Sequence, residues 1–318
     1  MKLFVTGGAG FIGSNYVRWV LARTGDEVTV YDALTYAGNL ATLAEVEKRS
    51  GHRYRFVHAD ICDLVALSKA VAGHDAVVHF AAESHVDRSI AGPEGFATTN
   101  CVGTNLVMQA ARQADVPRVV HISTDEVYGS VPHGSSVETD RLDPRSPYSA
   151  SKAGSDLIAL SYYTTYGLPV MVTRSSNNFG PWQYPEKLVP LFVTNLLDGK
   201  NVPLYGDGLN QRDWLFVEDN CAAVDLVLRA GQPGEIYNIG AGNEMPNRDL
   251  TDKLLVLAGA GPERIDYVTD RLGHDRRYSV ASEKVRAMGW QPEHDLDEAL
   301  ERTFAWYRDN RWWWEPLK

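Results

Sequence analysis

Two short segments carry side chains that could act together as acids and bases. In the first, Thr124, Asp125 and Glu126 follow an apolar run that begins at Val119. Such a run predicts a buried parallel strand, and open α/β sheets bind their ligands at the carboxyl ends of these strands. We therefore expect one hydroxyl group and two carboxyl groups in a ligand crevice.

The second segment contains Tyr148 and Lys152, which follow Pro147 at a spacing of one helical turn. Residues four apart lie on the same face of a helix, so the spacing places a phenol beside an ammonium group. Because a nearby cation makes a phenol easier to ionise, Tyr148 could act as a base toward an alcohol near neutral pH. A Tyr and a Lys at this spacing also occur by chance, so the surrounding segments decide what the pair means.

A glycine-rich turn near the amino terminus predicts a dinucleotide site. Gly7, Gly10 and Gly13 lie between a short apolar strand, 2–6, and a helical run that ends near residue 23. These glycines permit a tight turn, close approach of the backbone to a pyrophosphate, and close packing of helix on strand. The amino terminus of the helix would then face the phosphates.

Acidic and small residues at the following strand ends extend this site. The next three strands are predicted at 27–31, 54–59 and 76–80. Asp32 lies about 20 positions beyond the glycines, where a carboxylate can accept hydrogen bonds from ribose hydroxyls and repel a 2′-phosphate. Asp60 could bind the adenine amino group, and Ala81 and Ala82 could let a cofactor lie against the backbone. The pattern favours NAD over NADP.

The order of predicted elements indicates an α/β fold. Strands and helices alternate through residue 176, with a sixth strand at 170–175, which predicts a doubly wound parallel sheet of the Rossmann type. Beyond residue 177, Gly, Pro and clustered polar residues predict a smaller carboxyl-terminal substrate-binding lobe, 177–318. A helix and a strand between about 213 and 240 are expected to return to the first domain, 1–176.

The helical run 94–115 and the helix after Pro147 carry apolar residues on more than one face. Helices of this kind usually pack on the sheet on one side and on something else on the other, so they favour a homodimer built from helices.

Composition narrows the class of protein. The 318 residues are 44% hydrophobic and carry a formal net charge of −10, which argues for a globular protein and against a general nucleic-acid binder. Cys62, Cys101 and Cys221 are widely separated, which excludes a disulfide framework and Cys-x-x-Cys metal spacing. We expect them to be small buried hydrophobes in a reducing compartment. No signal segment and no run of about 18 apolar residues is found, so we expect a cytoplasmic protein without membrane contact.

A basic cluster stands out near the carboxyl terminus of this acidic chain. It comprises Arg271, His274, Arg276 and Arg277. Arginine clusters suit phosphate or carboxylate ligands. The alternative is a solvated loop whose charges are paired with the neighbouring Asp residues.

Taken together, these segments resemble the extended short-chain dehydrogenase/reductases over the whole chain. The glycine turn, the Tyr148/Lys152 pair and the polar strand end are shared by epimerases, reductases and dehydratases of nucleotide sugars. The Asp125-Glu126 pair is similar to that of the dTDP-glucose 4,6-dehydratases, as are segments 32–39, 79–89, 185–188 and 273–278. Phe179 and Trp182 stand where that family commonly has Tyr, and Gln211 where it has an aliphatic residue; these positions flank the presumed sugar site.

The resemblance implies an NAD-dependent lyase that converts dTDP-glucose to dTDP-4-keto-6-deoxyglucose for deoxysugar biosynthesis. Tyr148, assisted by Lys152, would take the C4 hydroxyl proton while hydride passes to NAD, and Thr124 would orient the C4 oxygen. Glu126 would then remove the C5 proton and Asp125 would protonate the departing C6 hydroxyl, after which the hydride returns to C6. The two carboxyl groups must hold opposite protonation states, so we expect their environments to push their pKa values apart.

Two alternatives remain open at this point. A nucleotide-sugar 4-epimerase would use the same first oxidation and leave C6 untouched. A regulatory protein that senses NAD without turnover would have no need of acid and base groups at the nicotinamide.

The resemblance also implies the binding residues, with no metal among the ligands. The expected cofactor residues are Gly7, Gly10, Phe11, Ile12, Gly13, Asp32, Leu34, Thr35, Asp60, Ile61, Ala81, Ala82, Thr99, Tyr148, Lys152 and Asn178. The expected substrate residues are Ser84, Thr124, Asn177, Lys187, Leu188, Tyr205, Arg212, Asn247, Arg271 and His274.

Overall fold

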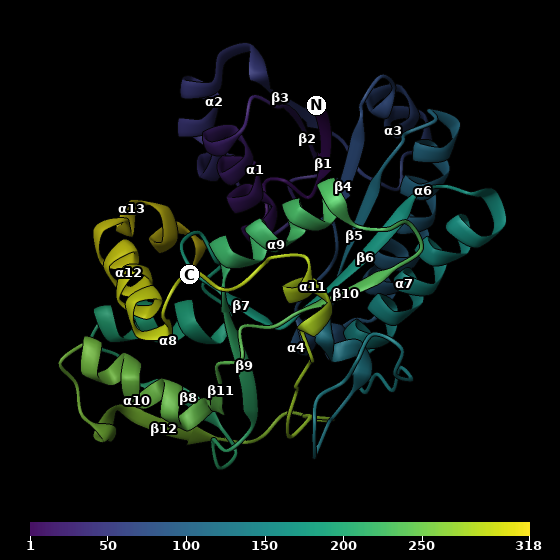
Figure 1. The fold of residues 1–318 in the computed structure, drawn as a ribbon. Helices are drawn as coiled ribbons and strands as arrows, with labels where there is room; N and C mark the ends of the chain where they lie inside the picture. The colour runs from purple at the N-terminus through teal and green to yellow at the C-terminus, as the bar shows by residue number, and fades with distance from the viewer.

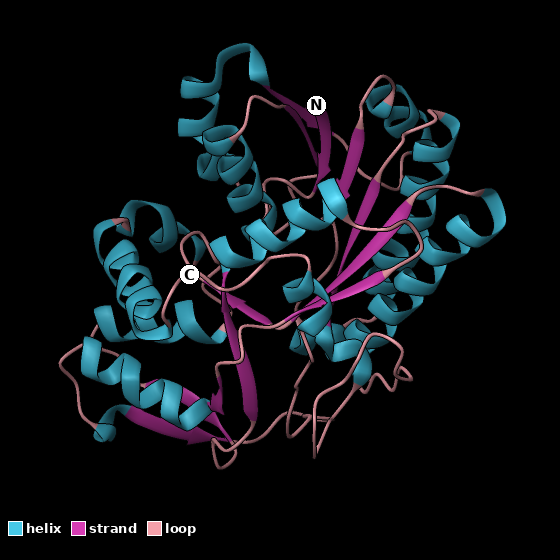
Figure 2. Ribbon diagram, in the orientation of Figure 1, coloured by secondary structure: helices cyan, strands magenta, loops and turns pink.

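A seven-stranded parallel sheet forms the centre of the larger part of the protein in the computed structural model, which describes residues 1–318 (Figures 1 and 2). Its strands are β1 (Lys2–Thr6), β2 (Glu27–Asp32), β3 (Tyr54–His58), β4 (Ala76–His79), β5 (Val119–Thr124), β6 (Val170–Ser175) and β10 (Ile236–Ile239). Their order is β10-β6-β5-β4-β1-β2-β3. The order reverses between β1 and β4, where doubly wound sheets bind their ligands, so the predicted fold class is confirmed.

Helices cover both faces of this sheet. Successive strand residues point to opposite sides, and here both sets of side chains are apolar. Leu3 and Val5 pack in one apolar cluster with α1 (Phe11–Arg23) and α9 (Val217–Ala230). Phe4 points the other way, into a cluster with α3 (Leu64–Val71), α6 (Thr104–Gln113) and α7 (Pro147–Tyr166). The sheet is thus buried on both faces, as parallel sheets require.

The predicted helix 94–115 consists of three pieces. These are α5 (Glu94–Phe96), the π-helical segment η3 (Ala97–Gly103) and α6. Asn100 in the π-helical segment donates to the backbone carbonyl of Glu83 at 3.0 Å and to the Ser151 hydroxyl at 2.8 Å. A π-helical turn widens a helix and often lies at a functional site. Here it joins the end of β4 to helix α7.

Helix α7 begins where the sequence provides a capping box. The Ser146 hydroxyl accepts from the backbone N–H of Ser149 at 3.0 Å, and the Ser149 hydroxyl accepts from the N–H of Ser146 at 3.0 Å. Pro147 occupies the first turn, and Gly167 ends the helix with φ 72°. The capping box and Pro147 fix the start of the helix, whose first two turns carry Tyr148 and Lys152.

The second part of the protein is built on two small sheets (Figure 1, lower left). One contains β7 (Asn177–Phe179), β9 (Gln211–Phe216) and β11 (Glu244–Pro246), and the other β8 (Val202–Tyr205) and β12 (Ile265–Val268). Helices α8 (Leu188–Leu197), α10 (Asn247–Leu257), α12 (Leu296–Asp309) and α13 (Arg311–Trp314) complete it. Trp313 and Trp314 are buried in its apolar core.

The remaining elements are short. They are η1 (Leu40–Leu43), α2 (Ala44–Ser50), η2 (Gly51–Arg53), α4 (Val86–Ala91), η4 (Asp125–Tyr128), η5 (Pro262–Arg264), α11 (Glu283–Ala287) and η6 (Glu315–Leu317).

Helix α9 and strand β10 lie with the large sheet, although they come from the second half of the chain. Ile236 pairs in parallel register with Val172 of β6. The helix predicted to begin near Asp213 begins at Val217 instead, because residues up to Phe216 form the end of β9. This strand pairs with β7 and β11 before the chain turns back to the large sheet.

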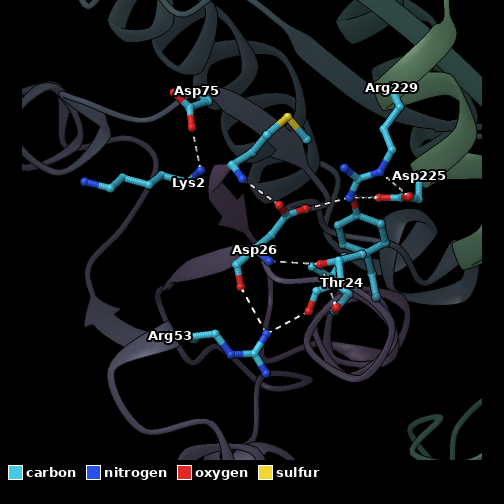
Figure 3. Close-up of polar contacts among 10 residues, drawn as sticks. Lys2, Thr24, Asp26, Arg53, Asp75, Asp225 and Arg229 are labelled. Atoms are coloured by element: carbon cyan, nitrogen blue, oxygen red, sulfur yellow. Dashed lines mark hydrogen bonds and ion pairs between the residues drawn. The ribbon is translucent and has the colours of Figure 1, made fainter.

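Charged side chains fasten α9 to the amino-terminal elements (Figure 3). Arg229 donates to Asp26 at 2.6 Å and to Asp225 at 2.6 Å. Asp26 also contacts the Met1 ammonium group at 2.5 Å, and Asp225 accepts from Tyr16 of α1 at 3.2 Å. Burial would raise the pKa of Asp26, but its hydrogen bonds from Arg229 and the Met1 ammonium group lower it overall. These pairs hold elements more than 200 positions apart in the sequence.

All three cysteines are free, and only Cys221 is buried; Cys62 and Cys101 are half-buried. The expectation that all three are buried is therefore wrong for two of them. Cys62 lies against the π-helical segment, where its thiol donates to Thr98 O, and Cys101 donates from that segment to Ser151 O on α7.

No helix in the structure combines the length and the apolar character that a membrane span requires.

Candidate active site

Two adjoining cavities lie at the carboxyl edge of the large sheet and continue between the two parts of the protein. The first runs over the ends of β1, β2, β4, β5 and β6, and the second reaches β8, α8 and α10. Both are lined by Ser84, Glu126, Asn177, Asn178, Gln183, Glu186 and Lys187. One elongated ligand could therefore occupy the second cavity and present one end to the first.

The first cavity collects the expected cofactor residues. Those that line it are Gly7, Gly10, Phe11, Ile12, Gly13, Asp32, Thr35, Asp60, Ile61, Ala81, Ala82, Thr99, Tyr148, Lys152 and Asn178. Leu34 does not line it, since its side chain packs against the apolar core between α1 and the sheet. Its backbone N–H donates instead to Asp32 at 2.8 Å, which accounts for its place beside the site.

The glycine turn leaves room for a phosphate group at the start of α1. Gly7 has φ 69°, and a Cβ atom there would lie 2.5 Å from the backbone nitrogen of Ala81. A Cβ on Gly13 would lie 2.3 Å from the carbonyl oxygen of Gly7. Only glycine permits this approach of β1, α1 and β4. The first turn of α1 has no acidic residue, so its positive end is open to an anion.

Asp32 is held at the floor of the same cavity. Its carboxylate oxygens accept from the backbone N–H groups of Ala9 at 2.9 Å and Leu34 at 2.8 Å. Burial raises its pKa, and these two N–H groups act in the opposite direction. Each carboxylate oxygen can accept further hydrogen bonds, so the arrangement fits ribose hydroxyls as ligands.

Lys152 and Tyr148 lie side by side on α7, but the free protein does not favour an ionised phenol. Burial and the charge of Glu126 raise the pKa of Tyr148, whereas the Thr124 hydroxyl lowers it less. Burial lowers the pKa of Lys152 to about 8. Lys152 Nζ donates to the carbonyl oxygen of Ile122 at 2.7 Å. The expectation that Lys152 alone makes Tyr148 easy to ionise is therefore not met in the absence of ligands.

The two adjacent carboxyl groups have different surroundings. Burial and the charges of Glu126 and Asp213 raise the pKa of Asp125 well above its usual value, and Arg212 only partly opposes this. Its Oδ1 accepts from the Thr124 hydroxyl at 3.2 Å, and its Oδ2 is buried without a hydrogen-bond partner. These surroundings favour the protonated form of Asp125, which suits it to serve as an acid.

Glu126 is also buried, and its pKa is raised above the usual value. Three cations oppose the effect of burial. These are Arg271, Arg212 and Lys187. Burial raises both pKa values, but the cations act mainly on Glu126, whereas a neighbouring carboxylate adds to the effect of burial on Asp125. The arrangement makes Glu126 the base of the pair.

The second cavity brings the expected substrate residues together. It is lined by Ser84, Asn177, Lys187, Leu188, Tyr205, Arg212, Asn247, Arg271 and His274, and Thr124 lies in the first cavity. Lys187 donates to Ser84 O at 2.7 Å, and Arg212 lies 4.1 Å over the ring of Tyr278. Three cations, Lys187, Arg212 and Arg271, line this cavity and suit a diphosphate group.

The basic cluster near the carboxyl terminus divides. Arg271 and His274 line the second cavity. Arg276 pairs with Asp207 at 2.8 Å and Arg277 with Glu244 at 2.7 Å, and neither lines either of these two cavities. Half of the cluster thus lies at the site, while the other half pairs with carboxylates outside the two cavities.

Several buried polar atoms in these cavities lack a partner in the protein. They are Ser123 Oγ, Asp125 Oδ2, Ser176 Oγ, Asn177 Oδ1, Asn178 Oδ1, Gln183 Oε1, Trp214 Nε1, Asn247 Oδ1 and Arg271 Nε. Because buried polar groups are almost always hydrogen-bonded, their concentration here indicates that a polar ligand completes the site.

Residues that the sequence interpretation did not assign also line the site. The Tyr278 hydroxyl donates to Asp275 at 2.8 Å and lies 3.5 Å from Glu126 Oε2. Glu186 accepts from Tyr36 at 2.9 Å. The sequence offered one signal for each residue: Glu186 precedes Lys187, and Tyr278 belongs to the 273–278 segment. Their contacts could not be predicted, because these contacts join distant parts of the chain.

Comparison with known proteins gives a consistent result. Residues 4–303 match the family model described as GDP-mannose 4,6 dehydratase. The dTDP-glucose 4,6-dehydratase of Streptomyces antibioticus is 55% identical over 325 residues, which cover 100% of this chain and 96% of the relative.

Solved structures agree. The chain superposes with a TM-score of 0.98 on the dTDP-glucose 4,6-dehydratase DesIV of Streptomyces venezuelae, crystallised with NAD, at 56% identity over the whole of both chains. The UDP-glucose 4-epimerase of Thermus thermophilus, also with NAD, gives 0.90 at 32% identity over 98% of this chain and 100% of that one.

Proposed function

The chain belongs to the GDP-mannose 4,6 dehydratase family, and we propose that it is a dTDP-glucose 4,6-dehydratase that uses NAD. It converts dTDP-glucose to dTDP-4-keto-6-deoxyglucose. The observation that carries this function is the pair of carboxyl groups in the cavity that also holds Tyr148. The pKa of Asp125 is raised well above its usual value, and three cations act on Glu126. An epimerase needs no such pair, and the epimerase relative is markedly less similar.

When bound, NAD would accept the hydride from C4 and later return it to C6, and its oxidised ring would be positively charged. Gly7, Gly13 and Asp32 fit NAD because the turn admits a pyrophosphate and the carboxylate faces the cavity. The carboxylate of Asp32 also disfavours a 2′-phosphate.

Tyr148 takes the proton of the C4 hydroxyl during the first oxidation. In the free protein its pKa is raised, so the phenol gives up its own proton only when positive charge is near it. Lys152, on the same helix face, contributes such charge, and Thr124 at the end of β5 orients the C4 oxygen. The resulting C4 ketone makes the C5 hydrogen acidic.

Glu126 then takes the C5 proton, and Asp125 gives its proton to the C6 hydroxyl, which leaves as water. After the hydride has returned to C6, Glu126 can give the proton back to C5. Glu126 is then ionised again, and the proton that Tyr148 took from the C4 hydroxyl replaces the one that Asp125 lost, so the cycle closes with the release of one water molecule.

A direct assay tests this function. Purified protein with NAD is mixed with dTDP-glucose or with UDP-glucose, and the product is weighed by mass spectrometry. We expect loss of one water molecule with dTDP-glucose. Inversion at C4 without loss of water would replace the dehydratase with the epimerase.

The two parts of the protein divide the work. Residues 1–176, with the returning helix and strand that end near residue 240, hold the cofactor, and residues 177–318 hold most of the nucleotide sugar. The lining of the two cavities supports this division. Because both ligands are intracellular metabolites, the protein works in the cytoplasm.

The protein also forms a homodimer through α7 and the π-helical segment before α6. Val102 and Leu157 in these elements are 52% and 62% exposed, although they are apolar. Light scattering of the purified protein measures the mass, and Leu157→Glu should shift a dimer to monomer.

A further inference from the structure

A fully buried carboxylate lies directly behind the active site. Asp156 follows Lys152 by one turn of α7 and is 0% exposed. Arg174 of β6 donates to it at 2.9 Å, and Nε2 of His121 lies 3.3 Å away. Asp156 lines neither cavity, so it cannot touch cofactor or substrate.

Asp156 is ionised despite its burial. Burial would raise its pKa, but the contact with His121 and the charges of Arg174 and Lys152 lower the pKa below its usual value. His121 itself is neutral near pH 7, because burial lowers its pKa to about 4. The carboxylate is therefore a fixed negative charge in the interior.

Lys152 has few other charged neighbours. Cys101 faces it from the π-helical segment, and burial raises the pKa of this thiol, which keeps it neutral. His79 of β4 and His121 of β5 are also neutral, because burial and nearby positive charge lower their pKa values. Asp156 is the charged group that favours the ammonium form of Lys152, against a burial that disfavours it.

The same carboxylate is joined to the turn that carries the acid and the base. Arg174, held by Asp156, donates through Nη1 to the Tyr128 hydroxyl at 2.8 Å, and this hydroxyl donates to Asn238 at 2.8 Å. Tyr128 ends the η4 turn that contains Asp125 and Glu126. A single buried chain of contacts therefore links α7, β6 and the η4 turn.

We propose that Asp156 is a positioning residue, which keeps Lys152 charged for the oxidation step without touching cofactor or substrate. The proposal rests on the proposed function, in which Lys152 assists Tyr148. The alternative is that Asp156 and Arg174 form an ion pair with a structural role only. Loss of such a pair would lower stability and the amount of active protein but would not move the pH at which Lys152 loses its proton.

The pH profile of Asp156→Asn separates the two possibilities. The amide keeps the shape of the side chain and removes its charge, so Lys152 should lose its proton at lower pH. An opposite charge within one helical turn typically moves a pKa by about 1–3. In Asp156→Asn we expect the alkaline midpoint of kcat/KM to move down by about 1–3 pH units. At pH 8 the variant should lose more in kcat than it changes in KM.

Two further variants guard against a folding defect. Asp156→Asn leaves Arg174 buried without a carboxylate, so the double variant Asp156→Asn, Arg174→Met removes both charges. Its midpoint should also lie below that of the wild type. Arg174→Met alone keeps the carboxylate, so its midpoint should stay at or above that of the wild type. A folded Asp156→Asn or double variant with the wild-type midpoint would overturn the proposal, as would a lowered midpoint in Arg174→Met alone.

The titration of Lys152 can also be followed without catalysis. Carbon-13 NMR of labelled lysine reports its pKa in the wild type and in Asp156→Asn, with Lys152→Met to assign the signal. An unchanged pKa would sink the positioning role even if the protein proved to catalyse another reaction. Failure of the wild type to dehydrate dTDP-glucose would instead count against the proposed function alone.

Discussion

Lys152 Nζ donates its hydrogen bond to the carbonyl oxygen of Ile122, at 2.7 Å, two residues before the strand delivers Thr124. The ammonium group is thus fastened to β5, the strand that leads into Asp125 and Glu126. The groups of the oxidation and those of the elimination consequently share one support. A shift of α7 relative to β5 would disturb both halves of the reaction.

Tyr148→Phe should strongly slow the first oxidation while leaving the fold intact. The ring still packs with Phe96 and Val86, but the proton acceptor is lost. A general base contributes about 10²- to 10⁴-fold, so kcat should fall by that factor. Stopped-flow absorbance of the reduced nicotinamide measures this step directly. Near-normal reduction in the variant would remove Tyr148 from the mechanism.

Activity should show a bell-shaped dependence on pH. Glu126 must be ionised, and because its pKa is raised above the usual 4.5, activity should appear only above that value as pH increases. Lys152 must be charged, and its pKa of about 8 means that activity should decline above pH 8. The measurement is kcat/KM between pH 5 and 10 at constant ionic strength. A profile flat to pH 10 would contradict the assigned role of Lys152.

The double variant Asp125→Asn, Glu126→Gln should separate oxidation from elimination. Both amides keep the size of the side chains but can neither take the C5 proton nor supply one to the C6 hydroxyl. Enzyme-bound reduced nicotinamide should still form with dTDP-glucose, whereas release of water should slow by about 10²-fold or more. Because the two groups serve one elimination, each single variant should cost nearly as much as the double.

Solvent deuterium gives an independent readout of Glu126. In deuterated water the wild-type product should carry deuterium at C5. Incorporation should be lost in Glu126→Gln and persist better in Asp125→Asn, because only Glu126 handles the C5 proton. Equal loss in both variants would mean that the two carboxyl groups do not have separate roles.

Gly7→Ala should destabilise the protein and weaken NAD binding. The new Cβ would lie 2.5 Å from the backbone of Ala81, at a φ of 69° that Ala disfavours. The cost in free energy of unfolding should exceed about 1 kcal/mol. Gly25→Ala is the control, since its Cβ would meet nothing within 4 Å. Thermal unfolding with and without NAD measures both effects, and equal results for the two variants would contradict the assigned role of the turn.

The sequence was informative where chemistry is local. The glycines, the strand ends and the capped helix of Tyr148 can each be recognised within a few residues, and nearly all the predicted binding residues line the two cavities. What it could not provide depends on distant segments. The raised pKa of Tyr148 arises from burial and from Glu126, and the division of the basic cluster depends on Asp207 and Glu244. The place of Tyr278 near Glu126 likewise requires two parts of the chain to meet.

The return of α9 and β10 to the large sheet has a consequence for exchanging parts between relatives. Arg229 of α9 binds Asp26, and Ile236 of β10 pairs with Val172. A chimera that takes residues 1–176 from one relative and 177–318 from another would therefore combine the large sheet of the first with the edge strand and covering helix of the second. A chimera intended to swap sugar specificity must instead keep 217–239 from the parent that supplies the amino-terminal part and graft the flanking segments around it. Laboratory recombination with one crossover should therefore yield few folded proteins, and the sugar-binding part should be inherited as interleaved blocks.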